Sequence, residues 1–273
     1  MRKLLSANFS RLFHSKVFWC CWAVMISLTA IPVLYFNRLW NSAQVRFLYG
    51  GDELLPFVSA VLIGLFLGTD YSNRTIRNKL VAGHVRRDIY GSNWVVCTVS
   101  VLIFHVTSLA MVLFLEYLLS GSFYRLPKNL FAGILVSTFA VVAVSTLLLF
   151  VSMLIQSRAI GVVVTIITGL FLYGSGSKLR GALLRPEYIS EYISDGKGNL
   201  LFDGNVLNPN YVSGVRRDIY EFLVDIHPVG QILQFDECTE LPRAWVLFPV
   251  YSVIFTIVIF FVGYYLFRRK DIK

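Results

Sequence analysis

The chain has 273 residues, of which 56% are hydrophobic and 15% are charged, with 25 Lys and Arg against 16 Asp and Glu. In a soluble protein this basic excess would indicate a nucleic-acid partner, but charge this sparse favours a polytopic membrane protein that binds no nucleic acid. The four His and four Cys show no metal-ligand spacing, and the sequence contains no G-x-x-x-x-G-K-[ST] loop. We therefore expect no metal site, no catalytic site and no cofactor in this chain.

Six apolar runs near or above about 20 residues predict six transmembrane helices. The expected spans are 17–36, 54–69, 94–119, 130–155, 159–174 and 245–267. The second and fifth runs are short, which leaves a re-entrant segment open for one of them. We predict that residues 1–273 form a single all-α transmembrane domain.

The distribution of Lys and Arg predicts the orientation in the membrane. If the N-terminus lies inside, the inner segments carry 14 basic residues, whereas the two short outer loops carry four. Six spans then place both termini in the cytoplasm. We expect a multi-pass protein of the cell (plasma) membrane.

Residues 1–16 predict an amphipathic helix that lies in the inner leaflet of the bilayer. Its apolar residues recur at helical spacing: Leu4, Leu5, Phe9, Leu12 and Phe13. The opposite side carries polar and basic residues: Arg2, Lys3, Ser6, Ser10, Arg11 and His14. Anionic lipid headgroups are the natural counter-charge of such a helix. The alternative is a simple positive flank for the first span.

The polar segment 70–93 interrupts the apolar pattern and carries helix signals of its own. Asn73 is a candidate N-cap, and Gly83 can end the helix. Ile76 and Leu80 lie four residues apart and share one helical face. A segment that only connected two spans would not need these signals. We predict a short cytoplasmic helix that serves as a docking surface.

Small residues recur at every fourth position of the fifth run, at Gly161, Thr165 and Gly169. Such a stripe lets another helix approach closely in lipid. The partner is either another span of the same chain or a second copy of the chain, and packing within the chain is the default interpretation.

Two ionisable residues, His105 and Glu116, stand inside the third run. Their spacing places both on one helical face, about 16 Å apart. Intramembrane ionisable groups are candidates for a substrate or proton role. The alternatives are that His105 is a neutral hydrogen-bonding residue between helices and that Glu116 lies at the outer headgroups.

Segment 175–243 is the only sizeable polar segment, and we expect it outside the membrane as a small cap that gates or shields a pathway. It has seven basic and ten acidic residues. Helix-like patches at 186–193 and 216–226 alternate with turn-rich stretches at 195–199 and 208–210. Cys238 would be the lone outer thiol. We expect it to be unpaired, with an intermolecular bridge as the alternative.

These features together resemble the permease subunits of type-2 ABC transporters. The specific part is the acidic residue Asp70 followed by Thr-Ile-Arg-Asn-Lys-Leu at 75–80 and by Gly-x-x-Arg at 83–86. The amphipathic start, the outer segment between spans five and six, and the basic tail 267–273 also fit. The resemblance implies a second permease subunit, as a homodimer or heterodimer, and a separate ATPase subunit that binds ATP and Mg²⁺.

In such permeases the segment between spans two and three is a coupling helix that sits in a groove of the ATPase. The resemblance carries this role to nine residues: Arg74, Thr75, Ile76, Arg77, Lys79, Leu80, Gly83, Arg86 and Arg87. It also implies alternating access through a central cavity lined by spans two and five. The candidates for the pathway are Gly64, Gly68, His105, Glu116, Gly161, Thr165 and Gly169.

The few charges within the spans favour an amphipathic peptide or a lipid-like molecule as the exported cargo. Two other functions stay open. One is a non-transporting accessory, immunity or sensing subunit that binds a peptide through its outer segment. The other is a proton-coupled carrier that uses His105 and Glu116.

Overall fold

The long apolar runs form helices because the bilayer core offers no water to backbone N–H and C=O groups, and a helix pairs these groups within itself. The computed structural model describes residues 1–40, 50–120, 129–194, 200–235 and 241–271. Within these residues, six helices are long and apolar enough to cross a membrane. The prediction of an all-α polytopic membrane protein is confirmed.

The membrane-spanning helices are α2 (Lys16–Trp40), α3 (Gly50–Ser72), α5 (Arg86–Ser120), α6 (Leu130–Leu154), α7 (Arg158–Leu183) and α10 (Phe248–Arg269). The other elements are α1 (Arg2–Phe13), α4 (Thr75–Val81), β1 (Tyr188–Ser194), β2 (Leu200–Leu207), α8 (Gly214–Ile226), α9 (Pro228–Leu233) and a 3₁₀ turn at Trp245–Leu247. With 23 residues in α3 and 26 in α7, both helices are long enough to cross a membrane, which favours six full spans over the alternative of a re-entrant segment.

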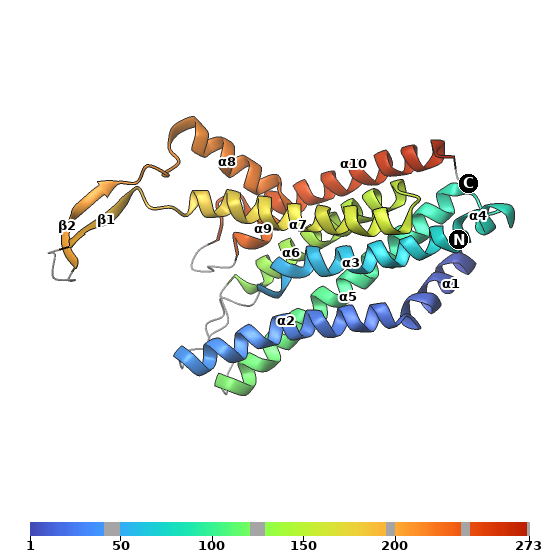
Figure 1. Cartoon of the computed structure of the whole chain (residues 1–273), viewed down its shortest axis with the longest axis horizontal. Helices are drawn as coiled ribbons and strands as arrows, with labels where there is room; N and C mark the ends of the chain where they lie inside the picture. Colours follow the sequence, from blue (N-terminus) through green and yellow to red (C-terminus); the bar gives the residue numbers. More distant parts are fainter. Residues whose placement is uncertain (41–49, 121–128, 195–199, 236–240, 272–273) are drawn as a thin grey trace.

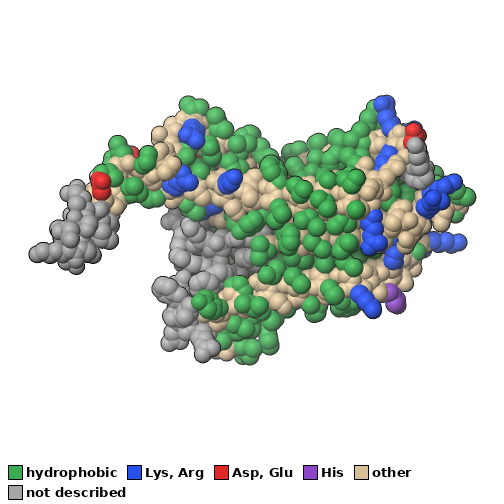
Figure 2. Space-filling model, in the orientation of Figure 1, with side chains coloured by type: hydrophobic (Ala, Val, Ile, Leu, Met, Phe, Trp, Pro, Cys, Tyr) green, Lys and Arg blue, Asp and Glu red, His purple; other side chains and the backbone are tan. Residues whose placement is uncertain are grey.

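The long helices run side by side, so the bundle has two ends of different character (Figure 1). One end carries α4 together with both chain termini, and we call it the α4 end. The other carries the β1–β2 hairpin and α8, and we call it the hairpin end. Figure 2 shows a broad hydrophobic surface between the two ends and basic side chains gathered at the α4 end.

Small residues allow α3 and α7 to pack closely. A Cβ added at Gly64, Gly68 or Gly169 would lie within 3.2 Å of an atom of the opposite helix. At Gly169 the nearest atom is the carbonyl oxygen of Pro56, at only 2.7 Å. Thr165 is fully buried in α7 and lies next to Gly64. Thr165 and Gly169 of the predicted stripe therefore pack against α3 of the same chain, whereas Gly161 faces Ile155.

Segment 175–243 is more varied than its sequence suggests. The patch at 186–193 is not helical but forms β1, which pairs antiparallel with β2 and has a register shift between Glu191 and Tyr192. Aromatic and β-branched residues such as Tyr188 and Ile189 favour an extended chain. The helix expected at 216–226 is present as α8. The turn at 195–199 and Cys238 lie outside the described residues.

His227 joins three helices at the hairpin end. Its Nδ1 accepts a hydrogen bond from the backbone N–H of Gly230 at 3.2 Å and so caps α9. The ring proton is then on Nε2, which lies 2.9 Å from Ser175 Oγ of α7. Burial lowers the pKa of His227 to about 4. The neutral ring is the form that makes both contacts.

Gly169→Ala is expected to destabilise the protein by about 1–3 kcal/mol, because the added methyl group meets backbone and a small side chain that cannot move aside. The thermal unfolding midpoint in detergent measures the effect. The matched control is Gly174→Ala in the same helix, where an added Cβ meets nothing within 4 Å. Equal midpoints for the two variants would contradict the close packing of α3 and α7.

Acid is expected to destabilise the hairpin end through His227. The folded-state pKa of about 4 lies below the ordinary histidine pKa of 6.5, so the stabilisation is complete above pH 6.5. It is lost as the pH falls toward 4, by about 3 kcal/mol for this one group. His227→Asn keeps a capping side chain without a titrating ring. Its unfolding midpoint should fall less than that of the wild type between pH 7 and pH 4.5, and parallel curves would refute the assignment.

Candidate functional site

The chain reverses direction between α3 and α4 at a left-handed residue. The backbone N–H of Asn73 donates to the Thr69 carbonyl at 3.0 Å, so Asn73 still belongs to the last turn of α3. Arg74 has a φ of 53° and a ψ of 22° and occupies the N-cap position of α4. The prediction that Asn73 caps α4 is therefore wrong. Its backbone N–H is already hydrogen-bonded within α3.

Gly83 ends α4, as the sequence predicts. Its φ is 86°, a conformation that costs glycine little. The N–H of Gly83 donates to the Leu80 carbonyl at 3.0 Å, and the N–H of His84 donates to the Lys79 carbonyl at 3.1 Å. This pair of bonds is the Schellman motif, which satisfies carbonyls that the helix itself leaves unpaired.

The apolar face of α4 contacts the protein rather than solvent. Ile76 has an exposed fraction of 1%, and Leu80 is partly buried against the core formed by the long helices. Ile76 therefore packs inward instead of forming an exposed docking face, and the docking role of Leu80 stays a prediction. Five exposed residues form the outer side of this segment, which we call the α4 surface: Arg74, Arg77, Val81, Val85 and Arg87.

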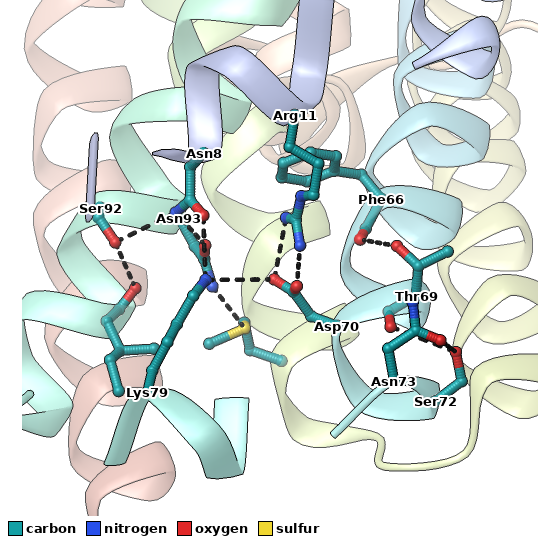
Figure 3. A network of polar contacts seen from close by, with 12 residues as sticks. Asn8, Arg11, Phe66, Thr69, Asp70, Ser72, Asn73, Lys79, Ser92 and Asn93 are labelled. Carbon is teal, nitrogen blue, oxygen red and sulfur yellow. Dashed lines mark hydrogen bonds and ion pairs between the residues drawn. The ribbon is translucent and has the colours of Figure 1, made fainter. Parts of the chain in front are cut away.

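A buried carboxylate holds α1 and α4 against α3 (Figure 3). Asp70, at the end of α3, is fully buried. Arg11 of α1 binds it with both terminal nitrogens, through Nη1 to Oδ1 and through Nη2 to Oδ2 at 2.9 Å. Lys79 Nζ of α4 lies 3.8 Å from Asp70 Oδ2. The Arg11 guanidinium also stacks over the Phe66 ring at 3.9 Å. We call Arg11, Asp70 and Lys79 the Asp70 cluster.

Asn8 extends this network to α5. Lys79 Nζ donates to Asn8 Oδ1 at 3.0 Å. Asn8 Nδ2 donates to Asn93 Oδ1 at 2.9 Å and to Ser92 Oγ at 3.3 Å. All three uncharged partners are buried. Four helices, α1, α3, α4 and α5, therefore meet in one continuous set of hydrogen bonds and ion pairs.

The Asp70 cluster holds two cations against one carboxylate. Burial, with the nearby charge of Arg11, lowers the pKa of Lys79 to about 8. Burial also lowers the pKa of Arg11 to about 10. Both side chains are therefore charged at neutral pH. The bidentate pair and the Asn8 oxygen offset the cost of removing these charges from water.

Arg86 binds the end of α10. Its Nη1 donates to the carbonyl oxygens of Phe267 at 3.0 Å, Arg268 at 3.1 Å and Lys270 at 2.5 Å. The last carbonyls of a helix have no partner within the helix and carry partial negative charge, so a guanidinium suits them. Lys270 Nζ in turn donates to the Met153 carbonyl of α6 at 3.0 Å.

These contacts differ from the roles predicted for three basic residues. Lys79 and Arg86 were expected on the docking surface, but both make the inward contacts described above. Arg11 was expected to face lipid headgroups, but its guanidinium binds Asp70. The helix predicted for residues 1–16 is present as α1, and polar as well as apolar side chains of α1 contact the bundle.

The pathway candidates fall into two groups. Gly64, Gly68, Thr165 and Gly169 lie between α3 and α7, whereas Gly161 faces Ile155 just before α7. The structure thus gives these residues a packing role. His105 is fully buried, and its Nε2 lies 3.2 Å from Thr138 Oγ1 and 3.4 Å from Ser137 Oγ of α6. Glu116 is buried further along α5.

Comparison with protein-family models gives no match, and comparison with curated proteins gives none either. Among the described residues, no group of three or more His, Cys, Asp or Glu side chains gathers where a metal ion could bind.

Sequence analysis missed Asn8 and assigned Arg11 to the wrong face, although a signal was present. Asp70 ends a long apolar helix with no cation beside it on that helix. A carboxylate in such a place needs a counter-charge from another element. Arg11 was available at the same end of the bundle, on a helix assigned to the lipid surface.

Asp70→Asn is expected to destabilise the protein by about 2–4 kcal/mol, because two partly buried cations lose their only carboxylate in the cluster. The thermal unfolding midpoint in detergent measures the loss. The control is Asp88→Asn, whose carboxylate is 23% exposed and pairs with the N-terminal amine at 3.5 Å. That change should cost about 1 kcal/mol or less.

A second variant identifies the cause. Adding Arg11→Gln to Asp70→Asn removes one of the two stranded charges, so the double variant should be more stable than the sum of the two single losses predicts. Strict additivity would contradict the ion pair.

Proposed function

We propose that this chain is the membrane-spanning permease subunit of an ATP-driven exporter, and that a separate ATPase subunit docks on the α4 surface. One observation carries the proposal. α4 is a helix of seven residues held by buried contacts on one side, while Arg77 and Val81 of α4, with Arg74, Val85 and Arg87 from the residues that flank it, are exposed. Val81 is 81% exposed and Val85 is 57% exposed. An exposed apolar pair within a basic rim suits a partner groove that is apolar at its floor and acidic at its edge.

We further propose that the α4 end faces the cytoplasm. Its inner segments carry 14 of the basic residues, as the positive-inside rule requires. Both termini lie at this end (Figure 1), and Figure 2 shows basic side chains gathered there. On this proposal the protein sits in the cell membrane with both termini inside, and ATP and Mg²⁺ bind in the cytoplasmic partner.

The contacts of α4 support a route for force into the bundle. A push on the α4 surface would act on α3 through Asp70, on α1 through Asn8, and on α10 through Arg86. Because α3 and α7 pack through small residues, they would move together as one unit. The export pathway would then open between this unit and a second permease subunit, with an amphipathic peptide or a lipid-like molecule as cargo.

The test is co-purification from native membranes, followed by mass spectrometry. We expect the wild-type chain to bring down an ATPase that carries a G-x-x-x-x-G-K-[ST] loop. Arg77→Glu combined with Val81→Asp should abolish this association, because the first change reverses a charge and the second places a carboxylate in the apolar contact. Both side chains are exposed, so the variant should fold with an unchanged unfolding midpoint.

The matched control is Arg243→Glu, which reverses an exposed arginine at the hairpin end and should retain the ATPase. The proposal fails if the wild type brings down no such ATPase, or if the double variant retains it fully.

A further inference from the structure

A groove lies at the hairpin end, between the last turns of α7, the turn at 209–212 and the first turns of α8. Its volume is about 840 Å³, within the range of small-ligand sites. Three cationic side chains line it, Lys178, Arg185 and Arg216, together with Tyr211 and Tyr220. No Asp or Glu is among its described lining residues. We call it the α7–α8 groove.

The described lining of the groove is positively charged. Among the described side chains of segment 175–243, six are basic and five are acidic, and the lining contains three of the basic ones and none of the acidic ones. The groove therefore suits an anion.

The three cations keep donors available. Lys178 is exposed and forms no ion pair within the described part of the chain. Arg185 makes one hydrogen bond, at 3.4 Å from Nη1 to the Asn210 carbonyl. Arg216 lies over the Tyr220 ring, with its guanidinium carbon 5.5 Å from the ring centre. Arginine offers five N–H donors, so most of these donors stay free for a ligand.

An apolar stripe on α8 adjoins the groove. Val215, Ile219, Phe222 and Leu223 repeat at helical spacing, and each is at least 45% exposed. Arg216 and Tyr220 lie on the neighbouring side of the same helix and line the groove. Figure 2 shows hydrophobic and basic side chains next to each other over this region. A helix with this pattern lies at a membrane surface, with its apolar side among acyl chains.

The place of the groove in the fold indicates the source of the anion. Lys178 belongs to the last turns of α7, a helix long enough to cross a bilayer. A span that begins near Arg158 and crosses about 30 Å of hydrocarbon would bring Lys178 to the lipid headgroups. Tyrosines such as Tyr211 and Tyr220 are frequent at this level. An acidic peptide would satisfy the cations but would give no reason for the exposed stripe on α8, whereas a lipid explains both.

We propose that the α7–α8 groove binds the phosphate headgroup of an anionic phospholipid, while the apolar stripe of α8 lies among the acyl chains beside it. The lysine and the two arginines would bind the phosphate oxygens, and arginine can do so through two N–H groups at once. The proposal depends only on the hairpin end and is independent of the ATPase proposed for the α4 end.

Native mass spectrometry of the full chain in a neutral detergent tests the proposal, with phosphatidylglycerol as the probe. We expect the wild type to bind phosphatidylglycerol more tightly than phosphatidylcholine. Arg216→Gln should weaken this binding by about threefold to tenfold, and the triple change of Lys178, Arg185 and Arg216 to Gln by at least about tenfold. The matched control is Arg243→Gln, which removes an exposed cation at the same end but outside the groove. It should bind as the wild type does.

Two further probes separate the lipid from other anions. Phe222→Asp should weaken phosphatidylglycerol binding but leave the weak binding of glycerol phosphate unchanged, since only the lipid has acyl chains. The proposal is overturned if the triple variant binds phosphatidylglycerol like the wild type, or if free glycerol phosphate binds as tightly as the lipid. It is also overturned if a hexaglutamate peptide displaces the lipid at equal concentration, which would assign the groove to an acidic peptide. Unchanged unfolding midpoints confirm that the variants fold.

Discussion

The buried carboxylate of Asp70 determines the arrangement of the α4 end. A carboxylate with no exposed surface stays ionised only if cations and hydrogen bonds replace the water it has lost. Arg11 and Lys79 provide that replacement from two other helices. The positions of α1 and α4 therefore follow from one residue at the end of α3. A helix of seven residues would be marginal in isolation, and the cluster explains why α4 has a fixed place.

This requirement divides the basic residues of the α4 end into two classes. Lys79 and Arg11 pair with the buried Asp70, and Arg86 binds the last carbonyls of α10, so all three hold helices together. Arg74, Arg77 and Arg87 contact solvent, so they are free to set orientation in the membrane and to meet a partner. A count of positive charges cannot separate the classes, because both contribute equally to the positive-inside pattern. Burial distinguishes the two classes: one side of the segment binds the rest of the bundle, and the other side is exposed to solvent.

Hydropathy predicted the spans because a helix can cross a membrane when its apolar run is long enough, and both length and composition of the run are read from the sequence. Gly83 was predictable too, since a left-handed helix end favours one residue type. The contacts at the α4 end were harder to predict from the sequence. The spacing of Ile76 and Leu80 showed that they share a face, but the neighbour of that face is set by tertiary packing. Asn73 has a side chain that can cap a helix, but its backbone N–H is already hydrogen-bonded within the last turn of α3.

Arginine has opposite surroundings at the two ends of the bundle. Arg11 is largely removed from water, so it needs Asp70 in the same structure. Arg216 lines an open groove whose described lining contains no acid, so water or the proposed anion would supply the counter-charge there. An ion pair within the fold holds helices in place, whereas a cation without a neighbouring carboxylate can bind an anionic ligand. On the two proposals above, force transmission uses the first arrangement and ligand binding uses the second. The presence or absence of a carboxylate beside each arginine, more than the number of arginines, therefore distinguishes the Asp70 cluster from the α7–α8 groove.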